Sequence, residues 1–180
     1  MGQHRKGEGM MAHATRIVIL GAESSGKSTL AEALAGHYGT VWVPEYLREF
    51  VETRGRVPFE EDQFGIALTQ LERENAQAAR ANRFLFCDTS PLMTAIYSRA
   101  YWNRVDAPLA ALAAKHDYAL TLVAAPDVPW EPDGLQRDGI ERRQEVHRMV
   151  IETLDERRIP FVQVGGDLPQ RLRQVRELLG

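Results

Sequence analysis

The segment between residues 21 and 28 constrains the fold more than any other part of the chain. It reads Gly-Ala-Glu-Ser-Ser-Gly-Lys-Ser, which matches the whole pattern G-x-x-x-x-G-K-[ST]. An apolar, β-branched run at 15–20 precedes it, and helix formers with apolar residues at helical spacing follow at 29–35. Strand, glycine loop and helix in this order are the context in which the pattern cradles phosphate groups. An ordinary Gly/Ser-rich turn would not explain the Lys-Ser pair. The segment therefore predicts a nucleoside-triphosphate site.

The residue types within this loop suit that chemistry. Gly21 and Gly26 allow a tight turn and a close approach of the backbone to phosphate. The N–H groups of the loop and of the following helix N-terminus present partial positive charge. We expect Lys27 to reach the β- and γ-phosphates of ATP or GTP, and the Ser28 hydroxyl to ligate Mg²⁺. The expected nucleotide-binding residues are Gly21, Glu23, Ser24, Ser25, Gly26, Lys27, Ser28 and Thr29.

The rest of the chain alternates predicted strands and helices, which favours a parallel sheet covered by helices on both faces. Further strands are expected at 40–43, 83–87, 118–124 and 160–164. Helices are expected at 45–53, 59–82, 91–100, 105–116, 139–158 and 168–179. The predicted fold is an α/β P-loop NTPase with three α/β/α layers and a five-stranded parallel sheet, its ligand at the carboxyl ends of the strands. Residues 1–14 are expected to be a disordered tail, and 15–180 one domain.

Composition narrows the function classes. With 44% apolar and 26% charged residues, the 180-residue chain has the composition of a globular protein. A net charge of −3 gives no case for bulk attraction to nucleic acid or to a membrane surface. The single cysteine, Cys87, excludes an internal disulfide, and its apolar neighbours predict a buried, inert thiol. The first fourteen residues contain neither a secretory signal nor a membrane span, so a cytoplasmic location is expected. Whether the chain forms a homo-oligomer stays open.

Two carboxylates follow predicted strands and are candidate catalytic residues. Asp88 ends the strand at 83–87, where a carboxylate can hold the water shell of Mg²⁺ or accept a proton from an attacking hydroxyl. Alternatively, Asp88 caps the next helix, a task that Thr89 or Ser90 takes if Asp88 is functional. Glu45 follows the second strand and is placed to orient or deprotonate an acceptor hydroxyl. The alternative for Glu45 is that it only suits the positive end of a helix dipole.

The loop at 125–138 is a candidate lid, because prolines and a glycine punctuate it and Arg137 lies near its end. An arginine that closes over a transferring phosphoryl group stabilises its charge and excludes water. Arg137 is therefore a candidate catalytic residue. The alternative is a surface loop beside a salt-bridged helix. Weaker candidates for phosphate or substrate contact are Arg48, Arg142, Arg143 and Arg148.

Several aromatic residues are candidates for stacking on a nucleobase or a nicotinamide ring, although aromatic residues at such spacing more often belong to a core. They are Tyr97, Tyr101, Trp102 and Trp130.

Four segments together resemble a known family. They are GAESSGKST at 21–29, EYLREFV at 45–51, FCDTSPLMT at 86–94 and DVPWEPDGLQRDG at 127–139. Over residues 15–165 the chain is similar to the ribosylnicotinamide kinase domain of the bacterial NAD-biosynthesis regulator family, within a wider set of small AAA-labelled P-loop ATPases. The family often has Asp where this chain has Ser90, and an arginine where it has Gln136.

The resemblance implies a nucleoside- or nucleotide-kinase-like domain that transfers the γ-phosphate of ATP to the 5′-hydroxyl of nicotinamide riboside and gives nicotinamide mononucleotide. It implies that 21–29 bind ATP, that Ser28 and Asp88 serve Mg²⁺, and that Asp88 and Glu45 serve the metal and the acceptor hydroxyl. Which of the two carboxylates is the base stays open.

Two alternatives remain at this stage: a kinase of the same fold with another nucleoside or metabolite as acceptor, and a regulatory ATPase that acts with a protein partner. Against a GTPase switch, the chain lacks an Asn-Lys-x-Asp motif for reading guanine. Against a AAA+ motor, its length leaves no room for a helical lid subdomain.

Overall fold

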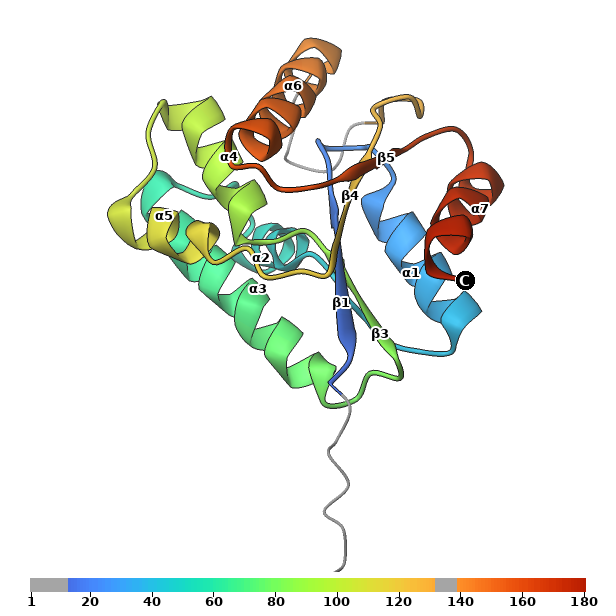
Figure 1. Ribbon diagram of the computed structural model, residues 1–180. Coiled ribbons are helices and arrows are strands. Elements are labelled where there is room, and N and C mark those ends of the chain that lie inside the picture. The colour runs from blue at the N-terminus through green and yellow to red at the C-terminus, as the bar shows by residue number, and fades with distance from the viewer. Residues whose placement is uncertain (1–12, 132–138) are drawn as a thin grey trace, which may run out of the picture.

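A computed structural model describes residues 13–131 and 139–180 as a twisted parallel sheet between two layers of helices (Figure 1). The strands are β1 (Thr15–Leu20), β2 (Trp42–Val43), β3 (Phe84–Asp88), β4 (Leu120–Ala124) and β5 (Val162–Val164). The α-helices are α1 (Lys27–Tyr38), α2 (Tyr46–Arg54), α3 (Gln63–Ala78), α4 (Pro91–Trp102), α5 (Ala107–Ala114), α6 (Ile140–Glu156) and α7 (Leu168–Leu179). The predicted α/β P-loop fold with five parallel strands is confirmed.

Strand β1 occupies the centre of the sheet, whose order is β2-β3-β1-β4-β5. Its residues Ile17 to Leu20 are fully buried, as expected for a strand covered on both faces. The parallel register sets Ile19 opposite Asp88 of β3 and Leu20 opposite Val123 of β4. The end of β1 therefore lies beside the ends of both neighbouring strands, and the residues that follow the strands meet at one edge.

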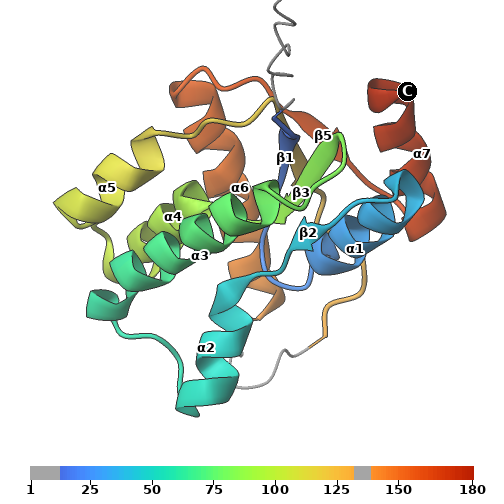
Figure 2. The same cartoon turned by 90° about the horizontal axis from the view of Figure 1, so that it is seen from below.

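The two helical layers bury alternate residues of the strands (Figure 2). Helices α1 and α7 pack on one face, against side chains that include Ile17 and Ile19. Helices α3 to α6 cover the other face, against side chains that include Val18 and Leu20. The period-2 alternation of these four β1 side chains gives the molecule two cores separated by the sheet.

The α-helix expected at 59–82 is shorter than predicted at both ends. It begins as a 3₁₀ turn, Glu60–Asp62, because the Asp62 carboxylate accepts a hydrogen bond from the Phe59 N–H at 2.7 Å. It ends at Ala78, and Arg83 then adopts a left-handed backbone with φ of 64° that turns the chain into β3. The prediction missed both because the helical composition continues through these segments.

Three strands begin two residues later than predicted, at Trp42, Leu120 and Val162, and β3 begins one residue later, at Phe84. At the first, the Thr40 hydroxyl donates to the Phe84 carbonyl at 2.7 Å and accepts from the Asn82 N–H at 2.9 Å, so the Thr40 side chain links the loop after α1 to the start of β3. The prediction that Cys87 is buried is confirmed, and burial raises the pKa of its thiol well above the usual value. The tail residues 1–12 lie outside the described residues.

None of the helices in the described part of the chain is both long and apolar enough to cross a membrane.

The partly buried His116, which follows α5, predicts a pH-dependent stability. Its Nε2 lies 2.9 Å from the Thr121 hydroxyl, and burial together with the charge of Arg157 lowers its pKa from 6.5 to about 4. Between about pH 6.5 and about pH 4, His116 is therefore protonated in the unfolded chain but not in the folded protein. As a result, the free energy of unfolding falls as the pH decreases through this range. We expect His116→Gln to flatten this fall in urea denaturation at pH 7, 5.5 and 4.5.

The exposed His37, changed to Gln, is the matched control and should keep the wild-type pH dependence. If His116→Gln also kept it, the pKa of His116 would be the same in the folded and the unfolded protein.

Candidate functional site

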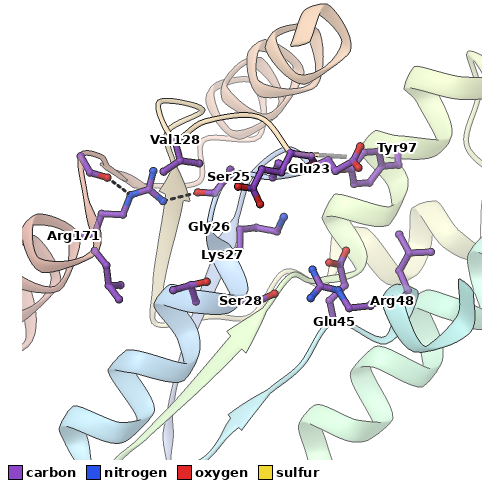
Figure 3. A pocket seen from close by; sticks show the side chains of 16 residues that line it. Glu23, Ser25, Gly26, Lys27, Ser28, Glu45, Arg48, Tyr97, Val128 and Arg171 are labelled. Carbon is purple, nitrogen blue, oxygen red and sulfur yellow. Dashed lines mark hydrogen bonds between the residues drawn. The ribbon is translucent and has the colours of Figure 1, made fainter. Parts of the chain in front are cut away.

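Two adjoining cavities lie at the carboxyl edge of the sheet. The larger, of about 480 Å³, surrounds the 21–28 loop (Figure 3). The smaller, of about 290 Å³, lies between α2, α3 and α4. Both are lined by Glu23, Glu45, Leu47 and Tyr97, so the cavities meet at these side chains.

The two glycines of the loop are required by its geometry. A Cβ on Gly21 would lie 2.7 Å from the Ser25 hydroxyl and 3.2 Å from the Ala124 carbonyl oxygen. Gly26 has a φ of 83° and is the residue from which α1 begins. The loop is therefore compact, and α1 directs its free N–H groups toward the larger cavity.

Lys27 is buried, and in Figure 3 its side chain points into the larger cavity. Its Nζ donates to the Ala22 carbonyl at 3.1 Å, a contact within the loop itself. Ser24, Ser25, Ser28 and Thr29 also line this cavity, so every predicted nucleotide-binding residue except Gly21, which closes the turn, is at its wall.

Arg171 of α7 supports the loop from behind, a role that the sequence did not predict. Its guanidinium donates to the carbonyls of Ser25 at 2.5 Å, Ala125 at 2.9 Å and Gly166 at 3.0 Å, and it pairs with Asp127 at 2.6 Å. Ser25 is buried, so the loss of this donor to its carbonyl would be unfavourable. Arg171 thus joins the phosphate loop to the ends of β4 and β5.

Arg143 makes a second support for the phosphate loop. Its Nη1 donates to the carbonyls of Ser24 at 3.2 Å and Val128 at 2.8 Å, and its side chain is buried. From the sequence, Arg143 is a weaker candidate for phosphate or substrate contact. The structure instead shows it holding the phosphate loop against the segment after β4.

Asp88 ends β3 directly beside Ser28, and the Ser28 hydroxyl donates to its Oδ2. The side chain of Asp88 is fully buried, and its Oδ1 has no hydrogen-bond partner among the residues described. Asp88 does not cap α4: the N-cap residue is Ser90, and no side chain makes a capping bond there. The buried hydroxyl of Ser90 is also without a partner in this part of the chain.

Burial raises the pKa of Asp88, and the charges of Lys27 and Arg48, with the Ser28 hydrogen bond, only partly offset this. A bound cation would favour the ionised carboxylate, because opposite charge at short range stabilises it. Two side-chain oxygens, Ser28 Oγ and Asp88 Oδ1, therefore fit a hard divalent cation. No group of three or more His, Cys, Asp or Glu side chains within residues 13–131 and 139–180 could hold a metal, so phosphate and water oxygens would complete its shell.

Glu45 lies where both cavities meet, and buried Gln70 of α3 fixes the loop that carries it. Glu45 is the N-cap residue of α2, yet its side chain makes no capping hydrogen bond. Gln70 accepts from the Tyr46 N–H at 2.7 Å and donates to the carbonyls of Pro44 at 3.2 Å and Asp88 at 3.5 Å. One amide thus ties the Glu45 loop to the end of β3. Gln70 was not predicted as a site residue, because nothing in the sequence around it differs from that of an exposed helical glutamine.

The smaller cavity is lined largely by apolar and aromatic side chains, including Tyr97, Tyr101 and Trp102. The rings of Tyr97 and Tyr101 are stacked with centroids 6.1 Å apart, and Trp102 lies 5.7 Å from Tyr101. Three of the four aromatic residues singled out in the sequence therefore gather at one cavity, whereas Trp130 lines neither.

Of the remaining arginines, Arg48 lines the larger cavity across from Lys27 (Figure 3). Arg142 donates to the Ala100 carbonyl at 3.2 Å, pairs with Glu145 at 3.1 Å and lies 5.2 Å from the centroid of the Tyr101 ring. The predicted lid residue Arg137 lies outside the described residues.

A central parallel strand, a glycine loop around the start of a helix and a carboxylate on the next strand define this chain as a P-loop nucleotide-binding protein. The sequence model of the AAA domain family matches residues 16–171. The chain belongs to this family.

Among known proteins, the chain is similar to the trifunctional NAD biosynthesis/regulator protein NadR of Escherichia coli strain K12. The two are 30% identical over 174 residues, which cover 91% of this chain and 42% of that protein. The chain thus spans less than half the length of this relative.

Solved structures share the fold. NadR in complex with NAD and AMP-PNP superposes with a TM-score of 0.74 at 19% identity, and NadR in complex with NR with 0.73 at 20%. Each match covers 93% of this chain and 49% of the other. Deoxyadenosine kinase from M. mycoides has a TM-score of 0.62 at 13% identity, over 92% of this chain and 98% of its own.

The contacts of Arg171 predict that its removal weakens nucleotide binding. We expect Arg171→Met to raise the dissociation constant for ATP by about tenfold or more, because the loss of charge-assisted hydrogen bonds leaves the loop carbonyls unsatisfied. Equilibrium binding of a fluorescent ATP analogue measures this. Arg173→Met, an exposed neighbour on α7, is the control. Equal affinities of the two variants would show that the loop does not depend on Arg171.

Proposed function

We propose that the protein is an ATP-dependent kinase, formed by residues 15–180, that phosphorylates the 5′-hydroxyl of nicotinamide riboside and gives nicotinamide mononucleotide. The observation that carries the proposal is the character of the smaller cavity. It adjoins the phosphate loop and presents aromatic rings and two carboxylates, Glu23 and Glu45. No lysine or arginine is among the described residues that line it.

This lining favours one kind of acceptor. A nucleoside monophosphate would need cationic partners for its phosphate, which are absent from this described wall. A positively charged pyridinium ring, by contrast, is favoured by aromatic faces and by nearby carboxylates. Nicotinamide riboside carries such a ring and no phosphate.

The comparisons support the same direction. The E. coli relative is named for NAD biosynthesis, NadR has been solved with NR and with AMP-PNP, and deoxyadenosine kinase shares the fold. The proposed setting is the cytoplasm, with no nucleic acid or membrane involved.

Each residue has a proposed task in this reaction. Lys27 and the loop N–H groups bind the β- and γ-phosphates, while Ser28 and Asp88 would hold Mg²⁺. When bound, the metal would neutralise charge on the phosphates. Glu45 lies between the phosphate loop and the acceptor cavity and orients the acceptor hydroxyl. Asp88 or Glu45 accepts its proton as the bond to phosphorus forms and ADP leaves. Arg137 is proposed to contact the transferring phosphoryl group.

The decisive experiment is detection of the phosphorylated product by mass spectrometry. The purified protein, with Mg-ATP, would be given nicotinamide riboside, the common ribonucleosides and deoxyribonucleosides, nucleoside monophosphates, or no acceptor. We expect nicotinamide mononucleotide to form fastest. Lys27→Ala should lower turnover by about a hundredfold or more, because charge on the β/γ-phosphates is then unbalanced.

Two other outcomes would contradict the proposal. Preferred phosphorylation of another acceptor would assign a different kinase. ADP formation at the same rate without any acceptor would assign an ATPase whose partner is a protein.

The two carboxylates are distinguished by variants of equal size. We expect Asp88→Asn and Glu45→Gln each to lower kcat by about 10² to 10⁴, with a much smaller change in the dissociation constant for ATP. For wild type, kcat/KM should fall at low pH because the catalytic base becomes protonated. The variant in which this fall is absent identifies the residue that acts as the base. Glu49→Gln, on the exposed face of α2 and paired with Arg73, is the control. Near-wild-type turnover would remove a residue from the catalytic set.

A further inference from the structure

Thr89 has a backbone conformation that its residue type disfavours. Its φ is 80°, in the region that favours glycine. The other non-glycine residues with positive φ in the described chain are Ser24, Arg83, Asn103 and Arg158, none of which is β-branched. A β-branched residue at positive φ is a genuine outlier, and such strain persists only where the surrounding structure enforces it.

The surroundings of Thr89 enforce this conformation from both sides. The Thr89 N–H donates to the Ile19 carbonyl at 3.0 Å, which extends the pairing between β3 and β1 by one residue. The next residue, Ser90, is extended, as the residue before a proline prefers, and it is followed by Pro91 at the start of α4. The whole change of direction from strand to helix therefore falls on Thr89. Glycine would make this turn without strain.

Thr89, which is next in sequence to Asp88, lines the smaller cavity. The residue is only 6% exposed, and its hydroxyl makes no hydrogen bond to any residue within the described ranges. The hydroxyl of a nearly enclosed cavity-lining residue that has no protein partner is suited to a ligand. The backbone strain and a hydroxyl without a protein partner thus occur at the same residue, on the wall proposed to face the acceptor.

We propose that Thr89 is a specificity-determining residue whose hydroxyl forms a hydrogen bond with a ribose hydroxyl of the acceptor, the 2′- or the 3′-hydroxyl. The inference rests on the proposed function, because it assumes that the smaller cavity holds the nucleoside. Glu45 orients the 5′-hydroxyl, Asp88 or Glu45 accepts its proton, and Thr89, which follows Asp88, binds the ribose that carries this hydroxyl. The contact selects ribosides over deoxyribosides.

A purely structural role would use only the methyl group of Thr89, and two variants separate the possibilities. Thr89→Val keeps the β-branched shape and the methyl packing but loses the hydroxyl, whereas Thr89→Ser keeps the hydroxyl. We expect kcat/KM for nicotinamide riboside to fall about tenfold in Thr89→Val and to stay within about threefold of wild type in Thr89→Ser. The KM for ATP should not change. Thr69→Val, on α3 outside both cavities, is the control.

Deoxy acceptors test the contact directly. Wild type and Thr89→Val would be compared on nicotinamide riboside and on its 2′-deoxy and 3′-deoxy forms. If Thr89 binds one ribose hydroxyl, Thr89→Val should not lower kcat/KM for the analogue that lacks this hydroxyl. It should still lower kcat/KM for the other analogue. A penalty that persists with both analogues, or no penalty at all, overturns the proposal.

Thr89→Gly gives a readout that does not depend on the acceptor. Because glycine relieves the strain, its melting temperature should be no lower than that of wild type, although its acceptor kcat/KM falls. A lower melting temperature would show that Thr89 serves stability. If wild type phosphorylates another nucleoside, the proposed substrate fails, and the same variants are measured on that nucleoside and its deoxy forms.

Discussion

The parallel pairing of β1 with both β3 and β4 determines where the chemistry of this protein lies. Because Ile19 stands opposite Asp88, the phosphate loop begins two residues beyond the level at which β3 delivers its carboxylate. The helix that follows the loop then brings Ser28 back to Asp88. A shift of β3 by one residue would move the Asp88 side chain to the opposite face of the sheet and place an apolar side chain at the site. The burial of β1 on both faces opposes such a shift.

The phosphate loop has two sides with different requirements. Its N–H groups must stay available for an anion, so they cannot donate hydrogen bonds to other groups of the protein. The carbonyl groups on the other side of the loop need hydrogen-bond donors. Arg171 and Arg143 supply these donors from α7 and α6. Two buried arginines therefore hold the loop open toward the cavity, and their positive charge is compatible with the phosphates that the loop is proposed to bind.

Local chemistry made the fold and much of the site predictable. The 21–28 pattern, the apolar strands and the carboxylates after them identify the edge at which Lys27, Ser28, Glu45 and Asp88 meet. The supporting residues were not predictable, because Gln70, Arg143 and Arg171 resemble surface residues of amphipathic helices until tertiary packing buries them. The strain at Thr89 was also hidden, since it arises from pairing with β1 on one side and from Pro91 on the other.

The hydrogen bond between Arg171 and Ser25 joins residues 146 positions apart. During synthesis on a ribosome, the motif at 21–28 emerges early, but its support emerges only with α7. Closing so long a segment of chain is an entropic cost that is met late in folding. A nascent chain that has reached β4 holds the complete motif without the fold that makes it a binding site. The phosphate loop therefore gains the support of Arg171 only after α7 has been synthesised and has packed against it.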